Sequence, residues 1–163
     1  MIIEYRMELD AERHPVLVKE KEYFCGNENF NSARKLVDLF NNIFRLRYLT
    51  EENVVMIAFD IKMHPLGVFH ISKGTVSCAM CSPREIFIRA LSIGAENVII
   101  CHNHPSGDPV PSEDDIKMAR RIYKSGELLN IRLSDFIIMG KSKYYSALED
   151  GVFDSEHDII YEE

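Results

Sequence analysis

The segment from residue 97 to residue 125 constrains the fold of this 163-residue chain most strongly. Residues 97–101, Asn-Val-Ile-Ile-Cys, form a short apolar run rich in β-branched residues, which predicts a buried strand. A loop stiffened by prolines and a glycine follows, and Ser112 then precedes an apolar pattern of helical period that ends near Gly126. The segment therefore predicts a strand, a rigid loop and a helix over 113–125 whose N-cap is Ser112.

Two histidines and an aspartate lie at the ends of these expected elements. His102 and His104 come at the carboxyl end of the strand, and side chains two residues apart on an extended chain point to the same face. Asp115 falls in the first helical turn, and the stiff loop can fold it back onto the histidines. Two imidazoles and one carboxylate, with a fourth position open to water, are the ligands of a catalytic zinc site. Ser112-x-x-Asp115 also resembles a helix capping box with Asp in place of Glu, and capping is compatible with metal binding.

The pattern His-Asn-His-Pro-Ser-Gly-x-Pro-x-Pro-Ser-x-x-Asp occupies residues 102–115. With it, the segment from Ser82 to Tyr145 resembles the RadC-like branch of the JAMM/MPN (JAB) metalloproteases, whose pattern is matched at every defined position. Ser82-Pro-Arg-Glu85 is similar to the Pro-Arg-Glu motif that opens a helix in that family. The resemblance covers residues 31–152 and is to a short form that lacks the family's N-terminal helical module.

The resemblance implies a zinc-dependent metallopeptidase that cleaves a peptide or isopeptide bond through zinc-activated water. It also implies an upstream catalytic glutamate at the start of the first core strand. Matching the apolar run 54–59 to that strand places this glutamate at Glu52, with Glu51 as the alternative one residue away. Glu52 would take the proton of the water and deliver it to the departing amine, and Ser112 would donate a hydrogen bond to the tetrahedral oxyanion. The substrate would be an unidentified protein or peptide.

Hydrophobic periodicity and capping signals predict an α/β fold, a mixed β-sheet sandwiched by helices as in JAMM/MPN and cytidine-deaminase-like proteins. We expect residues 1–30 to supply an edge-like strand over 3–9 and an irregular segment over 10–30, both packed on the core. The JAMM/MPN domain would cover residues 31–152, and 153–163 would be an acidic tail. Within the domain, we expect helices at 32–49, 83–93 and 113–125 and strands at 53–60, 66–76, 97–102, 131–139 and 143–146.

Composition predicts one compact cytoplasmic domain. The chain is 46% hydrophobic and 28% charged, and no apolar run approaches the roughly 18 residues that span a membrane. Its net charge of −7 opposes binding to phosphates, so we expect no nucleic-acid partner. Two alternatives remain beside the hydrolase: a RadC-type protein that is associated with DNA repair or binds DNA, and a metal-binding module without catalysis. A zinc deaminase would need His-x-Glu before its Cys-x-x-Cys, and the sequence has no His-x-Glu.

Other chemically active residues receive structural interpretations. Cys78 and Cys81 form a Cys-x-x-Cys that a half zinc site or a redox pair would use, but two small buried thiols are the interpretation we favour. Cys101 is expected in the core, and His70 is given no role. Phe136 follows Asp135 where members of the family commonly carry a histidine, so a contact near the site is expected to differ.

Overall fold

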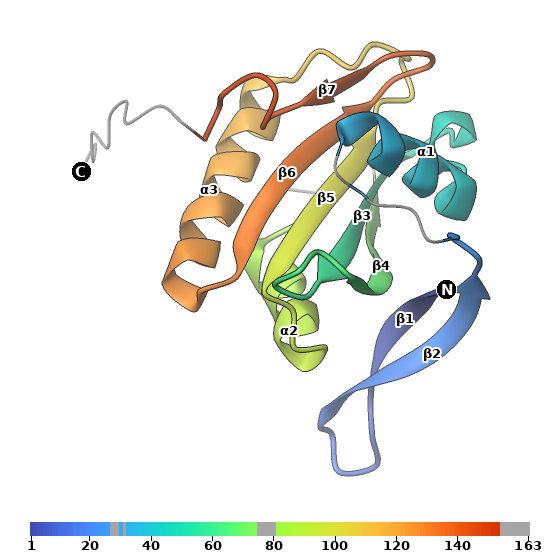
Figure 1. Cartoon of the computed structure of the whole chain (residues 1–163), viewed down its shortest axis with the longest axis vertical. Coiled ribbons are helices and arrows are strands. Elements are labelled where there is room, and N and C mark those ends of the chain that lie inside the picture. The colour runs from blue at the N-terminus through green and yellow to red at the C-terminus, as the bar shows by residue number, and fades with distance from the viewer. Residues whose placement is uncertain (27–29, 31, 75–80, 154–163) are drawn as a thin grey trace.

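A seven-stranded mixed β-sheet forms the centre of the protein, and helices cover both of its faces (Figure 1). The computed structural model describes residues 1–26, 30, 32–74 and 81–153. The strands are β1 (Ile2–Leu9), β2 (Pro15–Tyr23), β3 (Glu52–Phe59), β4 (Pro65–Gly74), β5 (Asn97–Asn103), β6 (Arg132–Met139) and β7 (Tyr144–Ser146). They lie in the order β2-β1-β4-β3-β5-β6-β7; β1 with β4 and β5 with β6 pair in parallel, and the other neighbours are antiparallel. The predicted α/β class is confirmed.

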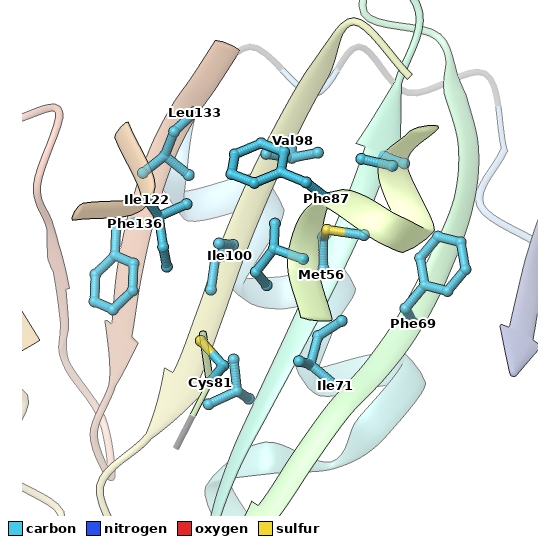
Figure 2. Packing of buried hydrophobic residues seen from close by; sticks show 14 of the residues in the cluster. Met56, Phe69, Ile71, Cys81, Phe87, Val98, Ile100, Ile122, Leu133 and Phe136 are labelled. Carbon is cyan, nitrogen blue, oxygen red and sulfur yellow. The ribbon is translucent and has the colours of Figure 1, made fainter. Parts of the chain in front are cut away.

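Each face of the sheet packs against its own helices. Helix α1 (Ala33–Phe44) and the short 3-10 helix η1 (Leu46–Tyr48) cover one face, and α2 (Pro83–Ser92) and α3 (Glu113–Leu129) cover the other. Because side chains alternate along a strand, β3 contributes Val54, Met56 and Ala58 to the α2/α3 face and the residues between them to the α1 face. Figure 2 shows part of the cluster on the α2/α3 face, with Phe87 of α2 and Ile122 of α3 packed among strand residues.

The expected helix starts are present. Helix α2 begins with a complete capping box between Ser82 and Glu85 and has a proline at the start of its first turn. Helix α3 begins at Ser112, whose side chain accepts a hydrogen bond from the backbone N–H of Asp115. These local signals were reliable because a cap satisfies free backbone groups within four residues and needs no tertiary partner.

The expectation that residues 10–30 are irregular was wrong. Residues 15–23 form β2, which pairs with β1 along its whole length, so β2 and not β1 is the edge strand. Most of β2 is exposed or half-buried, and its cross-strand contacts include an ion pair between Arg6 and Glu20. Three apolar residues, Val16 to Val18, are followed by four consecutive charged residues at 19–22, so the alternation that identifies half-buried strands was missing.

Two helix ends also differ from the prediction. Helix α3 continues through Gly126 to Leu129, and Asn130, with a φ of 54°, adopts the left-handed conformation that ends it. Helix α1 ends at Phe44 before a left-handed Arg45, and η1 fills part of the predicted remainder. The end of the strand expected over 66–76, Cys78 and nearly all of the expected acidic tail lie outside the described residues. Among the helices of the described part, none is long and apolar enough to cross a membrane.

Helix α3 continues through Gly126 because this glycine allows a close contact with the chain that follows the helix. A Cβ atom at this position would lie 2.2 Å from the backbone carbonyl oxygen of Ile131 and 3.3 Å from the ring of Phe87. The backbone N–H of Ile131 donates to the Gly126 carbonyl at 2.9 Å, so the chain leaving α3 packs directly on the helix. A glycine here permits close approach rather than ending the helix.

We therefore expect Gly126→Ala to destabilise the protein although alanine is the better helix former. The clash with backbone should exceed the helix-propensity gain of about 1 kcal/mol and lower the free energy of unfolding by about 2 kcal/mol net. Urea unfolding measures this change, with the exposed Lys124→Ala as a control that should stay within about 0.5 kcal/mol of the parent. A Gly126→Ala protein as stable as the parent would contradict the close packing.

Candidate metal centre

His102, His104 and Asp115 converge at the carboxyl end of β5. The Nε2 atoms of the two histidines are 3.0 Å apart. Asp115 Oδ1 lies 3.3 Å from His102 Nε2, and its Oδ2 lies 3.5 Å from His104 Nε2. All three residues offer a ligand atom within 4.8 Å of the others, and they are the group with this property among the described residues. The structure thus brings together side chains that the sequence separates by thirteen positions.

These separations fit a small tetrahedral cation. Ligand atoms about 2.0 to 2.1 Å from a zinc ion at tetrahedral angles are about 3.3 to 3.4 Å from one another. The separation of the two Nε2 atoms, 3.0 Å, and that of His102 Nε2 from Asp115 Oδ1, 3.3 Å, are close to that value. The 3.5 Å distance from His104 Nε2 is to the other carboxylate oxygen, Oδ2. Two imidazole nitrogens and one carboxylate oxygen also fall short of a closed four-ligand set, so the position toward solvent stays available.

His102 lies on the α2/α3 face of the sheet. Its side chain is 2% exposed, and its ring packs against the ring of Phe136 in a T-shaped arrangement with ring centroids 5.4 Å apart. Burial lowers the pKa of His102 to about 4, so its imidazole is neutral at physiological pH, as a metal ligand must be. Its Nδ1 atom is buried without a hydrogen-bond partner in the described part of the chain. Phe136, which packs against this imidazole, is an apolar ring and offers it no polar group.

His104 is oriented by the loop that follows β5. Its Nδ1 atom lies 2.8 Å from the carbonyl oxygen of Asp108, which can only accept, so Nδ1 carries a proton and Nε2 is directed at the cluster. The pKa of His104 is raised, chiefly by its hydrogen bond with Asp115 and also by the charge of Glu52.

The loop is held by its neighbours. The backbone N–H of His104 donates to Met139 at 2.9 Å, and that of Lys141 donates to Gly107 at 2.9 Å. A Cβ atom on Gly140 would lie 2.5 Å from the Gly107 carbonyl oxygen, so the turn after β6 packs directly on the loop. Arg47 reaches the other side of this turn and donates to the carbonyl of Lys141 at 2.7 Å. The position of His104 therefore depends on residues that the motif does not contain.

Asp115 is oriented by Ser112 and by its place in α3. The Ser112 backbone N–H and hydroxyl both donate to Asp115 Oδ2 at 2.7 Å, while Oδ1 faces His102. Burial alone would raise the pKa of Asp115, but the histidines and the Ser112 hydrogen bonds lower it well below the ordinary value. The N-terminus of the helix also favours a negative charge in its first turn. Asp115 is ionised and ready to bind a cation.

Glu52 and Glu51 differ in their surroundings. Glu52 is half-buried at the first position of β3, two residues before Val54, which pairs with His102. Opposed residues of an antiparallel pair share a face, so Glu52 belongs to the face that carries His102. The exposed Glu51 instead forms an ion pair with Lys73 at 2.8 Å.

A buried polar network that no sequence motif indicates lies beside the histidines. Asn103 and Asn53 are buried, and His70 contacts the Asn53 side chain at 2.8 Å. The sequence carries no local signal for this network, because its members lie on three strands that are far apart along the chain.

The raised pKa of His104 predicts a pH dependence of zinc binding. Zinc must displace the proton of His104, and this proton is present below its pKa and absent above it. We expect the apparent Kd for Zn²⁺ to rise by up to about tenfold per pH unit as the pH falls below the pKa of His104. The Kd should level off at pH values above that pKa. His102 stays neutral down to its pKa of about 4 and should not contribute near neutrality. Competition titration with a chromophoric chelator measures the effect, and a Kd that is constant from about pH 5.5 to 7.5 would contradict it.

Comparison with known proteins places the chain in a family. A family model described as a RadC-like JAB domain matches residues 30–152. A UPF0758 protein of Pelobacter propionicus is 37% identical over 125 residues, which cover 77% of this chain and 54% of the relative. A UPF0758 protein of Clostridium botulinum is 38% identical over 132 residues, covering 80% of this chain and 57% of the relative.

This chain spans about half the length of these curated relatives. The family suggests a metal-dependent hydrolase, and the cluster of His102, His104 and Asp115 could hold the metal ion. The resemblance seen in the sequence is confirmed by a match that covers most of the chain. The chain belongs to the RadC-like JAB domain family.

Proposed function

We propose that this domain is a zinc-dependent hydrolase of the JAMM type that cleaves a peptide or isopeptide bond. The observation that carries the proposal is the convergence of His102, His104 and Asp115 at distances that suit one tetrahedral cation. His102 and His104 would bind through Nε2 and Asp115 through Oδ1. A zinc ion held by them would supply an acidified water and a Lewis acid for the scissile carbonyl.

Glu52 is the proposed general base. Its position on the His102 face and its electrostatic influence on His104 support this role. From there its carboxylate would accept the proton of the attacking water and return it to the nitrogen of the leaving group. Glu51 is the weaker candidate. Alternation along the chain directs its side chain away from the His102 face, and it is paired with Lys73.

Ser112 is proposed to donate to the oxyanion of the tetrahedral intermediate. Its hydroxyl has one proton, which it gives to Asp115 Oδ2 at 2.7 Å when no substrate is present. Donation to an oxyanion therefore requires rotation of the hydroxyl, after which the Ser112 backbone N–H still holds Oδ2. Rotation about one bond would redirect the Ser112 proton from Asp115 to the oxyanion, while its oxygen can still accept from the Asp115 backbone N–H and cap the helix.

Glu52→Gln tests the assignment of the base. The substitution keeps the size of the side chain and leaves all three proposed ligands in place, so about one zinc per chain should remain bound. Removing the general base should abolish nearly all cleavage of a library of internally quenched fluorescent peptides. Glu51→Gln is the matched control and should retain both zinc and activity.

His104→Ala completes the experiment, because it should lose zinc and activity together. A Glu52→Gln protein with its zinc and full peptidase activity would refute the role of Glu52. Stoichiometric zinc in a parent protein that cleaves no member of the library, nor a ubiquitin-type isopeptide, would instead identify a metal-binding module without catalysis.

A further inference from the structure

Asn103, the residue between the two histidines, makes two hydrogen bonds to the start of β3. Its side-chain Oδ1 accepts from the backbone N–H of Asn53 at 2.8 Å, and its Nδ2 donates to the backbone carbonyl of Glu51 at 3.0 Å. The residue is 1% exposed, so water does not compete for either bond. The reversed orientation of the carboxamide would oppose donor to donor and acceptor to acceptor, which fixes the orientation.

These two hydrogen bonds hold the peptide groups on either side of the Glu52 Cα atom. The carbonyl of Glu51 belongs to the peptide group before the Glu52 Cα atom, and the N–H of Asn53 belongs to the peptide group after it. Holding both groups restrains the two backbone dihedrals of Glu52 and therefore the direction of its side chain. A carboxamide can do this because it has one donor edge and one acceptor, as a peptide group does.

The Asn103 side chain takes the place of backbone hydrogen-bond partners at the point where β5 ends. Its last residue is Asn103, and the chain then turns into the loop that begins with Pro105. The first residues of β3 extend to this point and would lose backbone partners on that side. The Asn103 side chain supplies them, on the face of the sheet opposite to His102.

Hydrogen bonds of the Asn53 side chain support those of Asn103. Asn53 is 3% exposed, and its Nδ2 also donates to the Glu51 carbonyl, at 2.8 Å. Its Oδ1 lies 2.8 Å from Nε2 of His70, which donates because a carboxamide oxygen can only accept. Both lone pairs of the Glu51 carbonyl are thereby engaged, and the backbone before Glu52 has little freedom to move.

We infer that Asn103 is a positioning residue that fixes the carboxylate of Glu52 relative to His102 and His104. The inference rests on the proposed function, because it assigns Asn103 an effect through the proposed base. The segment 102–104 would then position both the metal ion and the general base. Its histidines would hold the metal ion, and the asparagine between them holds the backbone that carries Glu52.

Asn103→Ala removes both bonds and leaves the three proposed ligands in place. We expect unchanged zinc stoichiometry, and a kcat for the best-cleaved quenched peptide that falls about 10- to 100-fold with little change in KM, since misplacement by about 1 Å has effects of this size. Asn103→Ser, a smaller polar side chain that cannot span both bonds, should change kcat in the same direction and serves if the alanine variant folds poorly.

Asn97→Ala is the matched control. Asn97 begins the same strand, and its carboxamide also makes two hydrogen bonds, with the carbonyl of Asp60 at 3.1 Å and the hydroxyl of Ser134 at 3.2 Å. Asn97 is half-buried, so this variant should lose two partly buried hydrogen bonds and some stability but keep the parent kcat. Equal losses of kcat in the two variants would overturn the inference, because they would reflect general destabilisation.

A double-mutant cycle separates positioning from other roles. If Asn103 acts through Glu52, Asn103→Ala should lower kcat in the parent and have no further effect in a Glu52→Gln background. An additional loss in that background, or an unchanged kcat in the parent, would overturn the inference.

Amide hydrogen exchange gives a readout that does not depend on activity. The backbone N–H of Asn53 should exchange at least about tenfold faster in Asn103→Ala than in the parent, and at the parent rate in Asn97→Ala. If the parent cleaves nothing, the proposed function fails, and the role of Asn103 in holding the backbone at Glu52 is still decided. Unchanged exchange at Asn53 would overturn it in either case.

Discussion

The antiparallel pairing of β3 with β5 is the constraint on which the site depends. Val54 opposes His102 in this pairing, so Glu52 and His102 share the α2/α3 face, and Asn53 and Asn103 are assigned to the other face. A shift of one residue would exchange these sets and direct Glu51 toward the histidines. The apolar residues of β3, buried on both faces, prevent that shift because each packs against a different helix layer.

The candidate metal centre lies where this buried sheet meets solvent, and the charges of its residues reflect that position. His102 is almost fully buried and neutral, while His104 and Asp115 are each 14% exposed and balance each other. A buried carboxylate without partners would be strongly destabilising, but Asp115 has the Ser112 donors and the helix N-terminus beside it. The same contacts that stabilise the fold in the absence of metal thus keep the ligands together in a metal-ready arrangement.

Local signals allowed much of this arrangement to be predicted. The spacing of His102, His104 and Asp115, the Ser112 cap and the apolar run before them lie within about twenty residues, where chain geometry limits the outcomes. The prediction failed at β2, whose exposed residues carry no alternation, and at Gly126, whose role is a close contact with Ile131 that no local pattern records. In both places a tertiary neighbour decided the structure.

The sequence by itself determined the family, the α/β class and the three candidate ligands, because these depend on residue identity and on short-range periodicity. Only the tertiary structure decided which glutamate faces the histidines, how Arg47 and Gly140 support the loop of His104, and that Asn103 reaches the backbone around Glu52. These contacts join residues about 35 to 95 positions apart, and strand register and close packing bring such residues together only once the whole sheet has formed.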